Sequence, residues 1–204
     1  MRVSAEDRAR VNAAIAAAEA NTSVDFVCVL VRAASNYEFY PLAWSVLVAL
    51  ALPWPLLWLT GLPFSSILLS QLIGFALAFL VLSAPPIRRI IVPRSVQRAA
   101  AHRAATEQFF IRGLANTPER RGVLLFVAYE EHYARVLADE GAATVIRAEA
   151  WQTAINLLVA EARQGRHADG FVTALAHCGD VARQACPIDG TRSNALPDRF
   201  FVLG

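Results

Sequence analysis

Residues 52–64 read LPWPLLWLTGLPF, an uncharged stretch with three prolines and two tryptophans. The uncharged region extends outward in both directions, because the nearest charged residues are Glu38 upstream and Arg88 downstream. The 49 residues between them contain no Asp, Glu, Lys or Arg. One membrane-spanning helix needs about 20 predominantly apolar residues. The region therefore has room for two such helices and a turn.

We expect the first transmembrane helix over residues 42–59 and the second over residues 66–82. Residues 60–63 (TGLP) have the composition of a turn. Pro85-Pro86 is expected to end the second helix, because proline cannot continue one. The alternative is a helical hairpin buried in a soluble core. Two adjacent apolar runs of about 18 residues are unusual in soluble cores and favour the membrane.

The first helix should also carry the features of a membrane helix. Pro53 and Pro55 are expected to kink it, which membrane helices tolerate better than soluble ones. Trp44, Trp54 and Trp58 are candidate interfacial anchors, although Trp54 lies rather deep for that role.

A basic segment follows the second helix. Residues 87–103 read IRRIIVPRSVQRAAAHR, a segment without acidic residues, and the next acidic residue after it is Glu107. Positively charged flanks stay in the cytoplasm, so both termini of a protein with this hairpin should lie there. The same side chains are suited to anionic lipid head groups. The membrane-interface arginines predicted in this way are Arg88, Arg89, Arg94, Arg98 and Arg103.

Composition limits the compartment and the partners. All 19 basic residues are arginine, which with the abundant alanine indicates a GC-rich bacterial genome and hence a bacterial inner membrane. The net charge of +2 argues against a general nucleic-acid binder. The three cysteines, Cys28, Cys178 and Cys186, form no disulfide framework and suit a reducing compartment.

The remaining 155 residues suffice for one domain with a core of its own. Ser4 with Asp7 resembles a capping box that opens a helix. Residues 24–31 (VDFVCVLV) and 122–128 (GVLLFVA) read as strands buried on both faces, and residues 133–138 as a strand nearer an edge.

Three further helices and a short strand complete the predicted domain. A helix is expected over residues 95–113, with Ser95 as its cap and Gly113 near its end. Two amphipathic helices follow residue 147, separated by a break marked by Gly165 and Asp169. The tail NALPDRFFVLG is expected to add a last short strand.

This order predicts an α/β fold in which a small mixed sheet is covered by helices on both faces. The two-helix transmembrane hairpin interrupts it. Residues 1–38 form the first part of the α/β domain, residues 39–87 the hairpin, and residues 88–204 the remainder of the domain.

Three stretches together resemble a known family. They are RVNAAIAAAEANTSVDFVCVLV, FFIRGLANTPERRGVLLFVAYEEHYARVLADEGAA and GRHADGFVTALAHCGDVARQACP. They are similar to the TPM domain, an α/β module of bacteria and chloroplasts, and most similar to a bacterial membrane-protein branch with a transmembrane hairpin inside the domain. The resemblance implies a TPM-like fold. Relatives have been linked to photosystem repair, receptor-associated assembly and acid phosphatase activity.

The resemblance rests on short patterns in a fixed order. A helix precedes Thr-x-x-acid at Thr22 and Asp25, Arg121-Gly122 precedes the second long strand, and Asp-x-Gly at residues 139–141 follows the third. The family commonly has Glu at the position of Asp25 and Thr at the position of Arg121.

The acidic residues near the strand ends are the candidates for a metal site. Asp25 and Asp139 are expected to approach one another at one edge of the sheet, with Glu130 or Glu140 near enough to help. Carboxylate oxygens suit a hard divalent cation, so the cofactor considered is Ca²⁺ or Mg²⁺. The alternative is structural: Arg121 or Arg135 pairs with either acid, or Asp25 reaches solvent or caps a helix.

Two other polar clusters favour structural interpretations. Glu130, Glu131 and His132 read as a solvated turn. Residues 177–186 contain His177, Cys178, Asp180 and Cys186, but their spacing matches no common zinc pattern, and Cys178 lies on an apolar helix face.

No motif for a particular enzyme reaction is present, so no catalytic residue is assigned. The function expected first is a membrane-anchored binding or assembly module that acts on a membrane protein complex. The alternative is a divalent-metal-dependent phosphatase-like hydrolase. A transporter is disfavoured, because the two predicted spans contain no ionisable group.

Overall fold

The computed structural model describes residues 3–61, 63–117, 119–188 and 200–203. The chain divides into two compact units. Residues 1–34 with 98–204 form the first, here called the sheet unit, and residues 35–97 form the second, the hairpin unit.

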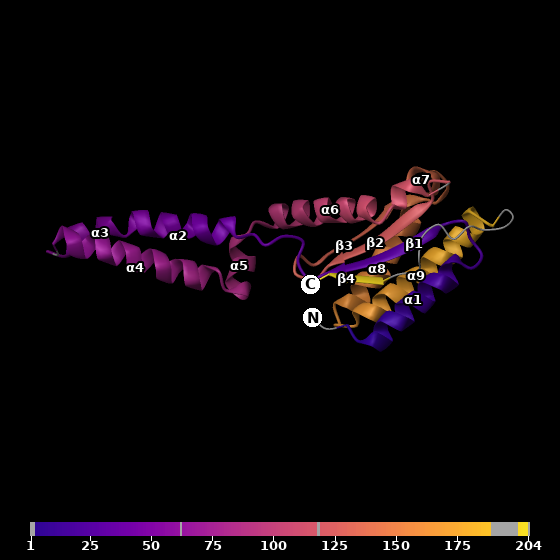
Figure 1. The fold of residues 1–204 in the computed structure, drawn as a ribbon, viewed down its shortest axis with the longest axis horizontal. Helices are drawn as coiled ribbons and strands as arrows, with labels where there is room; N and C mark the ends of the chain where they lie inside the picture. Colours follow the sequence, from indigo (N-terminus) through magenta and orange to yellow (C-terminus); the bar gives the residue numbers. More distant parts are fainter. Residues whose placement is uncertain (1–2, 62, 118, 189–199, 204) are drawn as a thin grey trace. The chain divides into compact units, whose positions relative to one another are not determined.

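The sheet unit is built on a four-stranded mixed sheet with the order β3-β2-β1-β4 (Figure 1). The strands are β1 (Asp25–Val31), β2 (Gly122–Ala128), β3 (Tyr133–Ala138) and β4 (Phe200–Leu203). Strand β1 runs parallel to both neighbours, β2 and β4, whereas β3 is antiparallel to β2. The α/β fold class and the edge position of the third predicted strand are therefore confirmed.

The central strands form two cores because their side chains alternate between the two faces of the sheet. Every residue of β1 and β2 is buried. Phe26, Cys28 and Leu30 of β1 belong to one core, and Val27 and Val29 belong to the other. Apolar side chains on both faces are what a strand covered on both sides requires.

Helices cover both faces of the sheet (Figure 1). Helices α1 (Ala5–Glu19), α8 (Ala148–Ala162) and α9 (His167–Ala185) contribute to the first core. Helix α6 (Arg94–Ile111) and the 3-10 turn η1 (Leu114–Asn116) contribute to the second. The predicted capping box is present, because Ser4 accepts from the Asp7 N–H and Asp7 accepts from the Ser4 N–H.

Helix α9 packs very closely against α1. A Cβ at Gly179 would lie 2.8 Å from the Cα of Ala18, so only glycine allows this separation. The approach brings Val11 and Ile15 of α1 into the core.

The hairpin unit contains α2 (Phe39–Ala51), α3 (Pro53–Leu59), α4 (Phe64–Leu82) and α5 (Pro85–Ile91). The predicted kink is a full break at Leu52, where Pro53 begins a new helix. Buried residues of α2 recur every four positions, at Pro41, Ser45 and Ala49, which is the spacing of one helix face.

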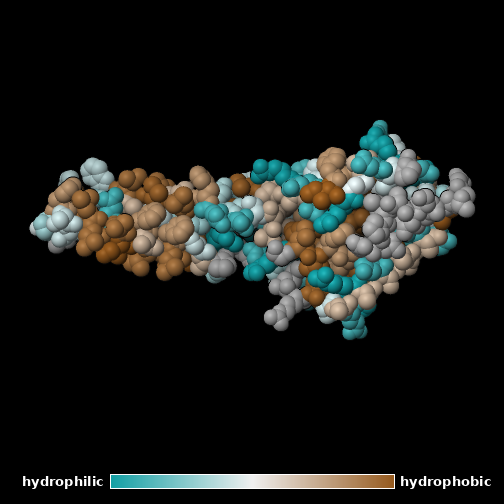
Figure 2. All heavy atoms as spheres, in the orientation of Figure 1, coloured by the Kyte–Doolittle hydropathy of each residue, from teal (hydrophilic) through white to brown (hydrophobic). Residues whose placement is uncertain are grey.

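The other faces of these helices carry exposed apolar side chains. Figure 2 shows hydrophobic residues, in brown, over most of the visible surface of α2, α3 and α4. Among the described residues, Trp58 is the most exposed large apolar side chain, at 87%. The ranges Phe39–Leu59 and Phe64–Leu82 are long and apolar enough to cross a membrane, and only 11% and 6% of an 18-residue apolar window in each is buried.

Several predicted boundaries were wrong. Helix α4 ends at Leu82 as predicted, but it begins at Phe64, and Pro85-Pro86 begins α5 instead of ending the helix before it, since proline suits the first turn. Helix α6 begins at Arg94, so Ser95 lies inside its first turn. Asp169 lies in the first turn of α9, and the break before that helix is at Gly165, whose φ is 78°.

Two further points concern the third strand and the tail. The Asp-x-Gly pattern at residues 139–141 lies at the start of a short helix, α7 (Glu140–Val145), which the sequence did not predict. Strand β4 confirms the last predicted strand over residues 200–203. The rest of the tail, residues 194–199 and 204, lies outside the described residues.

Candidate functional site

Three of the four acidic residues predicted to form a site, Asp25, Asp139 and Glu140, lie at the end of the sheet where β1 and β2 begin and β3 ends. The Asp25 N–H donates to the carbonyl of Arg121 (3.3 Å), and the Asp139 N–H donates to the carbonyl of Gly122 (2.9 Å). The two residues are 5% and 7% exposed. Asp25 and Asp139 therefore lie at the same end of the sheet, on either side of the first residue of β2.

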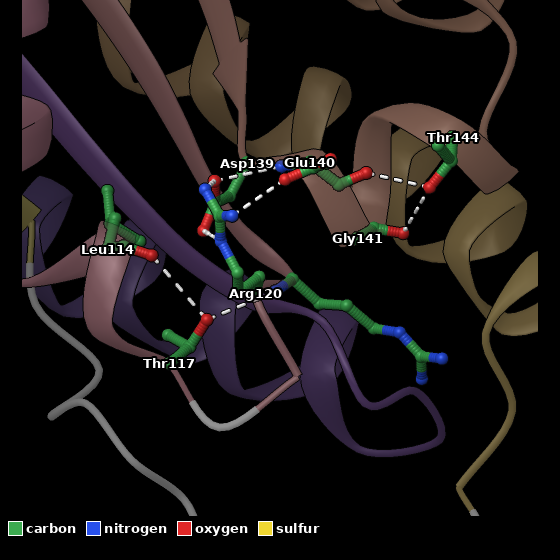
Figure 3. Close-up of polar contacts among 8 residues, drawn as sticks. Leu114, Thr117, Arg120, Asp139, Glu140, Gly141 and Thr144 are labelled. Atoms are coloured by element: carbon green, nitrogen blue, oxygen red, sulfur yellow. Dashed lines mark hydrogen bonds and ion pairs between the residues drawn. The ribbon is translucent and has the colours of Figure 1, made fainter.

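Arg120 binds two of these acidic residues (Figure 3). Its Nη2 and Nε lie 3.0 and 3.3 Å from the two carboxylate oxygens of Asp139, and its Nη1 lies 2.6 Å from Glu140 Oε2. The contact with Asp139 is a bidentate ion pair, which fixes orientation as well as charge. The hydrogen bond that Arg120 donates to Asp139, together with the negative charges of Asp139 and Glu140, raises the pKa of Arg120.

Asp139 also caps the helix that follows it. Its Oδ1 accepts from the Glu140 N–H (2.8 Å), and Asp139 is the N-cap of α7. A carboxylate at a helix N-terminus satisfies free N–H groups and is favoured by the helix dipole. One side chain thus joins the end of β3, the start of α7 and the loop that carries Arg120.

The backbone of that loop depends on two glycines. Arg120 has a φ of 51°, in the left-handed region, and its carbonyl accepts from the Gly141 N–H (2.8 Å). A Cβ at Gly141 would collide with the carbonyl of Glu119, and one at Gly122 would collide with the carbonyl of Leu114. The glycines of the Arg-Gly and Asp-x-Gly patterns are required because loop backbone packs directly on both.

Thr22 and Glu19 fasten the start of β1 at this same end. The buried Thr22 hydroxyl donates to the carbonyl of Cys186 (2.8 Å) after α9. Glu19, also buried, accepts from the Phe26 N–H (2.6 Å) through Oε1. Thr22 of the Thr-x-x-acid pattern therefore has a structural role: its hydroxyl joins the segment after α1 to the C-terminal end of α9.

The fourth predicted ligand, Glu130, lies elsewhere. It follows β2 at the opposite end of the sheet, where its Oε1 lies 3.1 Å from Arg32 Nε. Its neighbour Glu131 accepts from the Ala34 N–H (2.8 Å). Of the predicted set, the structure brings Asp139 and Glu140 together, places Asp25 across β2 from them, and leaves Glu130 apart.

The donor set can be compared with what a cation requires. Ca²⁺ takes six to eight oxygen ligands. Within the described ranges, no group of three or more His, Cys, Asp or Glu side chains is placed to hold a metal ion. Asp139 and Glu140 are turned toward a guanidinium, so in this arrangement Arg120 supplies the positive charge.

The arginine that binds Asp139 and Glu140 is Arg120, which the sequence did not indicate. Arg121 pairs with Glu119 and donates to the Ser23 hydroxyl, and Arg135 contacts His102. Asp139 is bound by Arg120 instead, so the pairing of Asp139 with Arg121 or Arg135 was wrong, whereas the pairing of either arginine with Asp25 stays a prediction. Two adjacent arginines before Gly122 look alike in sequence, and only the left-handed backbone at Arg120 turns its side chain toward Asp139.

The cysteines lie in the core, as the apolar helix face predicts. Cys28, Cys178 and Cys186 are all buried and free. Burial raises the pKa of Cys178 to about 12 and also raises that of Cys28. Neither thiol is suited to nucleophilic chemistry, which needs the thiolate.

The predicted membrane-interface arginines lie on α5 and α6. Arg94, Arg98 and Arg103 are exposed, and Arg88 is half-buried. Arg89 belongs to α5, and its side chain is not described.

The fold is thus a mixed four-stranded sheet covered on both faces, with two acids bound to a loop arginine at one end. Residues 86–181, which contain β2 and β3, match the family model of the TPM domain. The chain therefore contains a TPM domain, which confirms the resemblance to that domain, whereas the resemblance to its membrane-protein branch stays a prediction.

A solved structure supports the same fold. The NMR structure of the BA42 protein from the psychrophilic bacterium Bizionia argentinensis is similar over 99% of this chain and 96% of its own, with a TM-score of 0.62 and 17% sequence identity. At that identity the similarity shows the fold alone. No curated protein sequence matches this chain.

Proposed function

We propose that the protein is a membrane-anchored binding or assembly module. The hairpin spans the bacterial inner membrane and holds the TPM domain beside a membrane protein complex, which the domain binds. The observation that carries this proposal is the exposed apolar surface of α2, α3 and α4.

That surface is larger than one expects on a soluble unit. Trp54, Leu59 and Leu72 are all more than half exposed, and they are a few of the many large apolar side chains that face outward between residues 39 and 82. Soluble monomers rarely expose contiguous apolar patches beyond a few hundred Å². Lipid is a favourable environment for such a surface, and the arginines of α5 and α6 suit its cytoplasmic face.

Sheet topology adds a constraint on any membrane arrangement. Strand β1 precedes the hairpin, β2 follows it, and the two pair along their whole length. The chain must therefore return to the side from which it left, which requires an even number of crossings. Two spans with a positive flank place both termini in the cytoplasm.

Reporter fusions test this topology. A fluorescent protein and an alkaline phosphatase fused in turn at residue 1 and residue 204 should report the cytoplasm at both ends. Periplasmic signals at both ends would invert the hairpin and overturn the cytoplasmic assignment. Extraction of the protein from membranes by carbonate would overturn the membrane span itself.

Affinity purification from native membranes tests the assembly role. The matched control is Gly141→Ala, which disturbs the TPM domain and leaves the hairpin sequence intact. A partner recovered by the wild type and lost by the variant is bound through the TPM domain. Failure to recover any specific partner after crosslinking would refute the assembly role.

A divalent-metal-dependent phosphatase-like hydrolase is the second candidate. The observation that favours it is the convergence of Asp139 and Glu140 on one cationic group, with the Glu140 side chain 71% exposed. Displacement of the Arg120 side chain would free two carboxylates for Ca²⁺ or Mg²⁺, and Asp25 lies at the same end of the sheet. Calorimetry should then show binding that Asp139→Asn removes, and the purified protein should hydrolyse phosphoesters only with metal. Absence of both would eliminate this candidate.

A further inference from the structure

Strand β3 carries one arginine, Arg135, on the sheet face that α6 covers. Tyr133 and Leu137, its neighbours on that face, pack against the core beneath α6. The Arg135 side chain is exposed, with Nη1 lying 3.0 Å from Nδ1 of His102 on α6 and 3.4 Å from the Tyr133 hydroxyl.

Neither partner of Arg135 is a carboxylate. A guanidinium stays protonated and only donates, so the Nδ1 of His102 must be the unprotonated acceptor. No described carboxylate lies within ion-pair distance of Arg135. Seven other arginines differ in this respect, because each pairs with a carboxylate: Arg10, Arg32, Arg120, Arg121, Arg147, Arg166 and Arg183.

A second arginine lies beside this pair. Arg98 is exposed and precedes His102 by one helical turn, and side chains four apart on a helix are neighbours. Among the described residues it has no ion-pair partner either. His102 therefore contacts Arg135 and has Arg98 one helical turn away, and neither arginine has an ion-pair partner among the described residues.

These groups match the chemistry of a phosphate ester. The planar fork of arginine binds phosphate oxygens through paired hydrogen bonds. With Nδ1 as acceptor, the His102 ring carries its proton on Nε2 and supplies a further donor.

We propose that Arg98, His102 and Arg135, with the Tyr133 hydroxyl, form a binding site for the phosphate of an anionic phospholipid head group. Lipid is the expected source because α6 continues the basic segment that follows the hairpin. The choice of lipid rests on the proposed membrane anchor, whereas the phosphate chemistry rests on the side chains alone.

The test uses the full chain in a neutral maltoside micelle, so it does not depend on insertion into a bilayer. Dihexanoyl phosphatidylglycerol is titrated in, and the imidazole resonances of the four histidines are followed by NMR. We expect a saturable shift at His102, assigned by its loss in His102→Gln. Dihexanoyl phosphatidylcholine, which carries no net charge, should give a much weaker shift of the His102 resonance.

Substitutions distinguish a specific binding site from a general electrostatic attraction of the lipid to positive charge. Arg135→Gln should raise the Kd about tenfold or more, the loss expected for a charge-assisted hydrogen bond. Arg163→Gln is the matched control: it removes the same charge from an exposed position at the C-terminal end of α8, a helix on the opposite face of the sheet, and it should leave the Kd nearly unchanged. Arg135→Lys should retain part of the affinity.

Three outcomes would overturn the proposal. A His102 resonance that does not move with phosphatidylglycerol would exclude the site, and equal weakening by Arg163→Gln and Arg135→Gln would reduce it to a diffuse positive surface. Glycerol 1-phosphate binding as tightly as the lipid would assign the site to soluble phosphate esters. The membrane anchor would be refuted separately, by carbonate extraction of the protein.

Discussion

Gly141 occupies a position where the absence of a side chain is a steric requirement. A Cβ there would collide with the carbonyl of Glu119 and lie 2.8 Å from the carbonyl of Arg120. Both are backbone atoms, so a rotamer change cannot relieve the contact. The loop that presents Arg120 to Asp139 therefore depends on this glycine.

Gly141→Ala should lower the free energy of unfolding of the TPM domain by about 2–3 kcal/mol, the usual cost of overpacking at a rigid site. Hydrogen exchange of the β1 and β2 amides measures this energy without interference from the hairpin helices. Gly165→Ala is the control, because its Cβ would meet no atom and only the φ of 78° is strained. It should cost about 1 kcal/mol. Equal losses for the two variants would contradict the steric explanation.

The buried thiol of Cys178 predicts an alkaline limit to stability. The pKa of this thiol rises from its ordinary value of 9.0 to about 12 on burial, so the folded state keeps a proton that the unfolded chain releases. The contribution is fully present below pH 9.0 and is lost as the pH rises toward about 12. By linkage, three pH units correspond to about 4 kcal/mol.

Unfolding measured by denaturant at several pH values should therefore show a shallower loss of stability above pH 9 in Cys178→Ala than in the wild type. Cys186→Ala is the control. Burial raises the pKa of Cys186 too, but nearby Arg121 opposes the rise, so its effect on the slope should be smaller. Identical slopes for Cys178→Ala and the wild type would contradict the linkage.

At the scale of elements, the separation of α1 and α9 depends on Gly179. Gly179→Leu should push the helices apart, because a Cβ alone would meet the backbone of Ala18. We expect a loss of at least about 2 kcal/mol in the free energy of unfolding and faster hydrogen exchange in α1. Ala176→Leu places the same side chain on the exposed side of α9 and should change stability by about 0.5 kcal/mol or less. A similar loss for both variants would contradict the role of Gly179.

The elements that the sequence identified best are those defined by their own hydrophobic pattern. The bounds of β2 and β3 are as predicted, because each is an apolar or mixed run bounded by turn residues. Helix α7 was missed because six residues are too few to show a period, and Asp-x-Gly is also typical of a turn.

The candidate site was less predictable than the strands. Asp139 and Glu140 are neighbours in sequence, and their shared end of the sheet follows from the strand order. Their partner Arg120 depends on a left-handed residue that loop packing imposes, which no local pattern encodes. Glu130 could have been excluded from the sequence, because it follows β2 whereas Asp139 follows β3, and the ends of two consecutive antiparallel strands lie at opposite ends of the sheet.

For the whole molecule, β1 cannot be dispensed with. It is fully buried and pairs with both β2 and β4. A fragment of residues 88–204 should therefore expose the apolar side of β2, at about 25 cal/mol per Å² of apolar surface. We expect this fragment to aggregate, and addition of a peptide of residues 1–34 to restore part of the exchange protection in β2. A soluble fragment with protected β2 amides on its own would contradict the central role of β1.

The position of β1 before the hairpin has a consequence for synthesis on the ribosome. Its nearest partner, β2, begins about 90 residues after β1 ends, so at about 5–20 residues per second β1 waits roughly 5–20 s for a neighbour. During that interval the translocation machinery would handle the hairpin while an unpaired apolar strand stands outside the bilayer. Such a strand is prone to pair with other chains. Nascent copies of this protein should therefore depend on a holding chaperone, and depletion of that chaperone should cause aggregation during translation without affecting protein that has already folded.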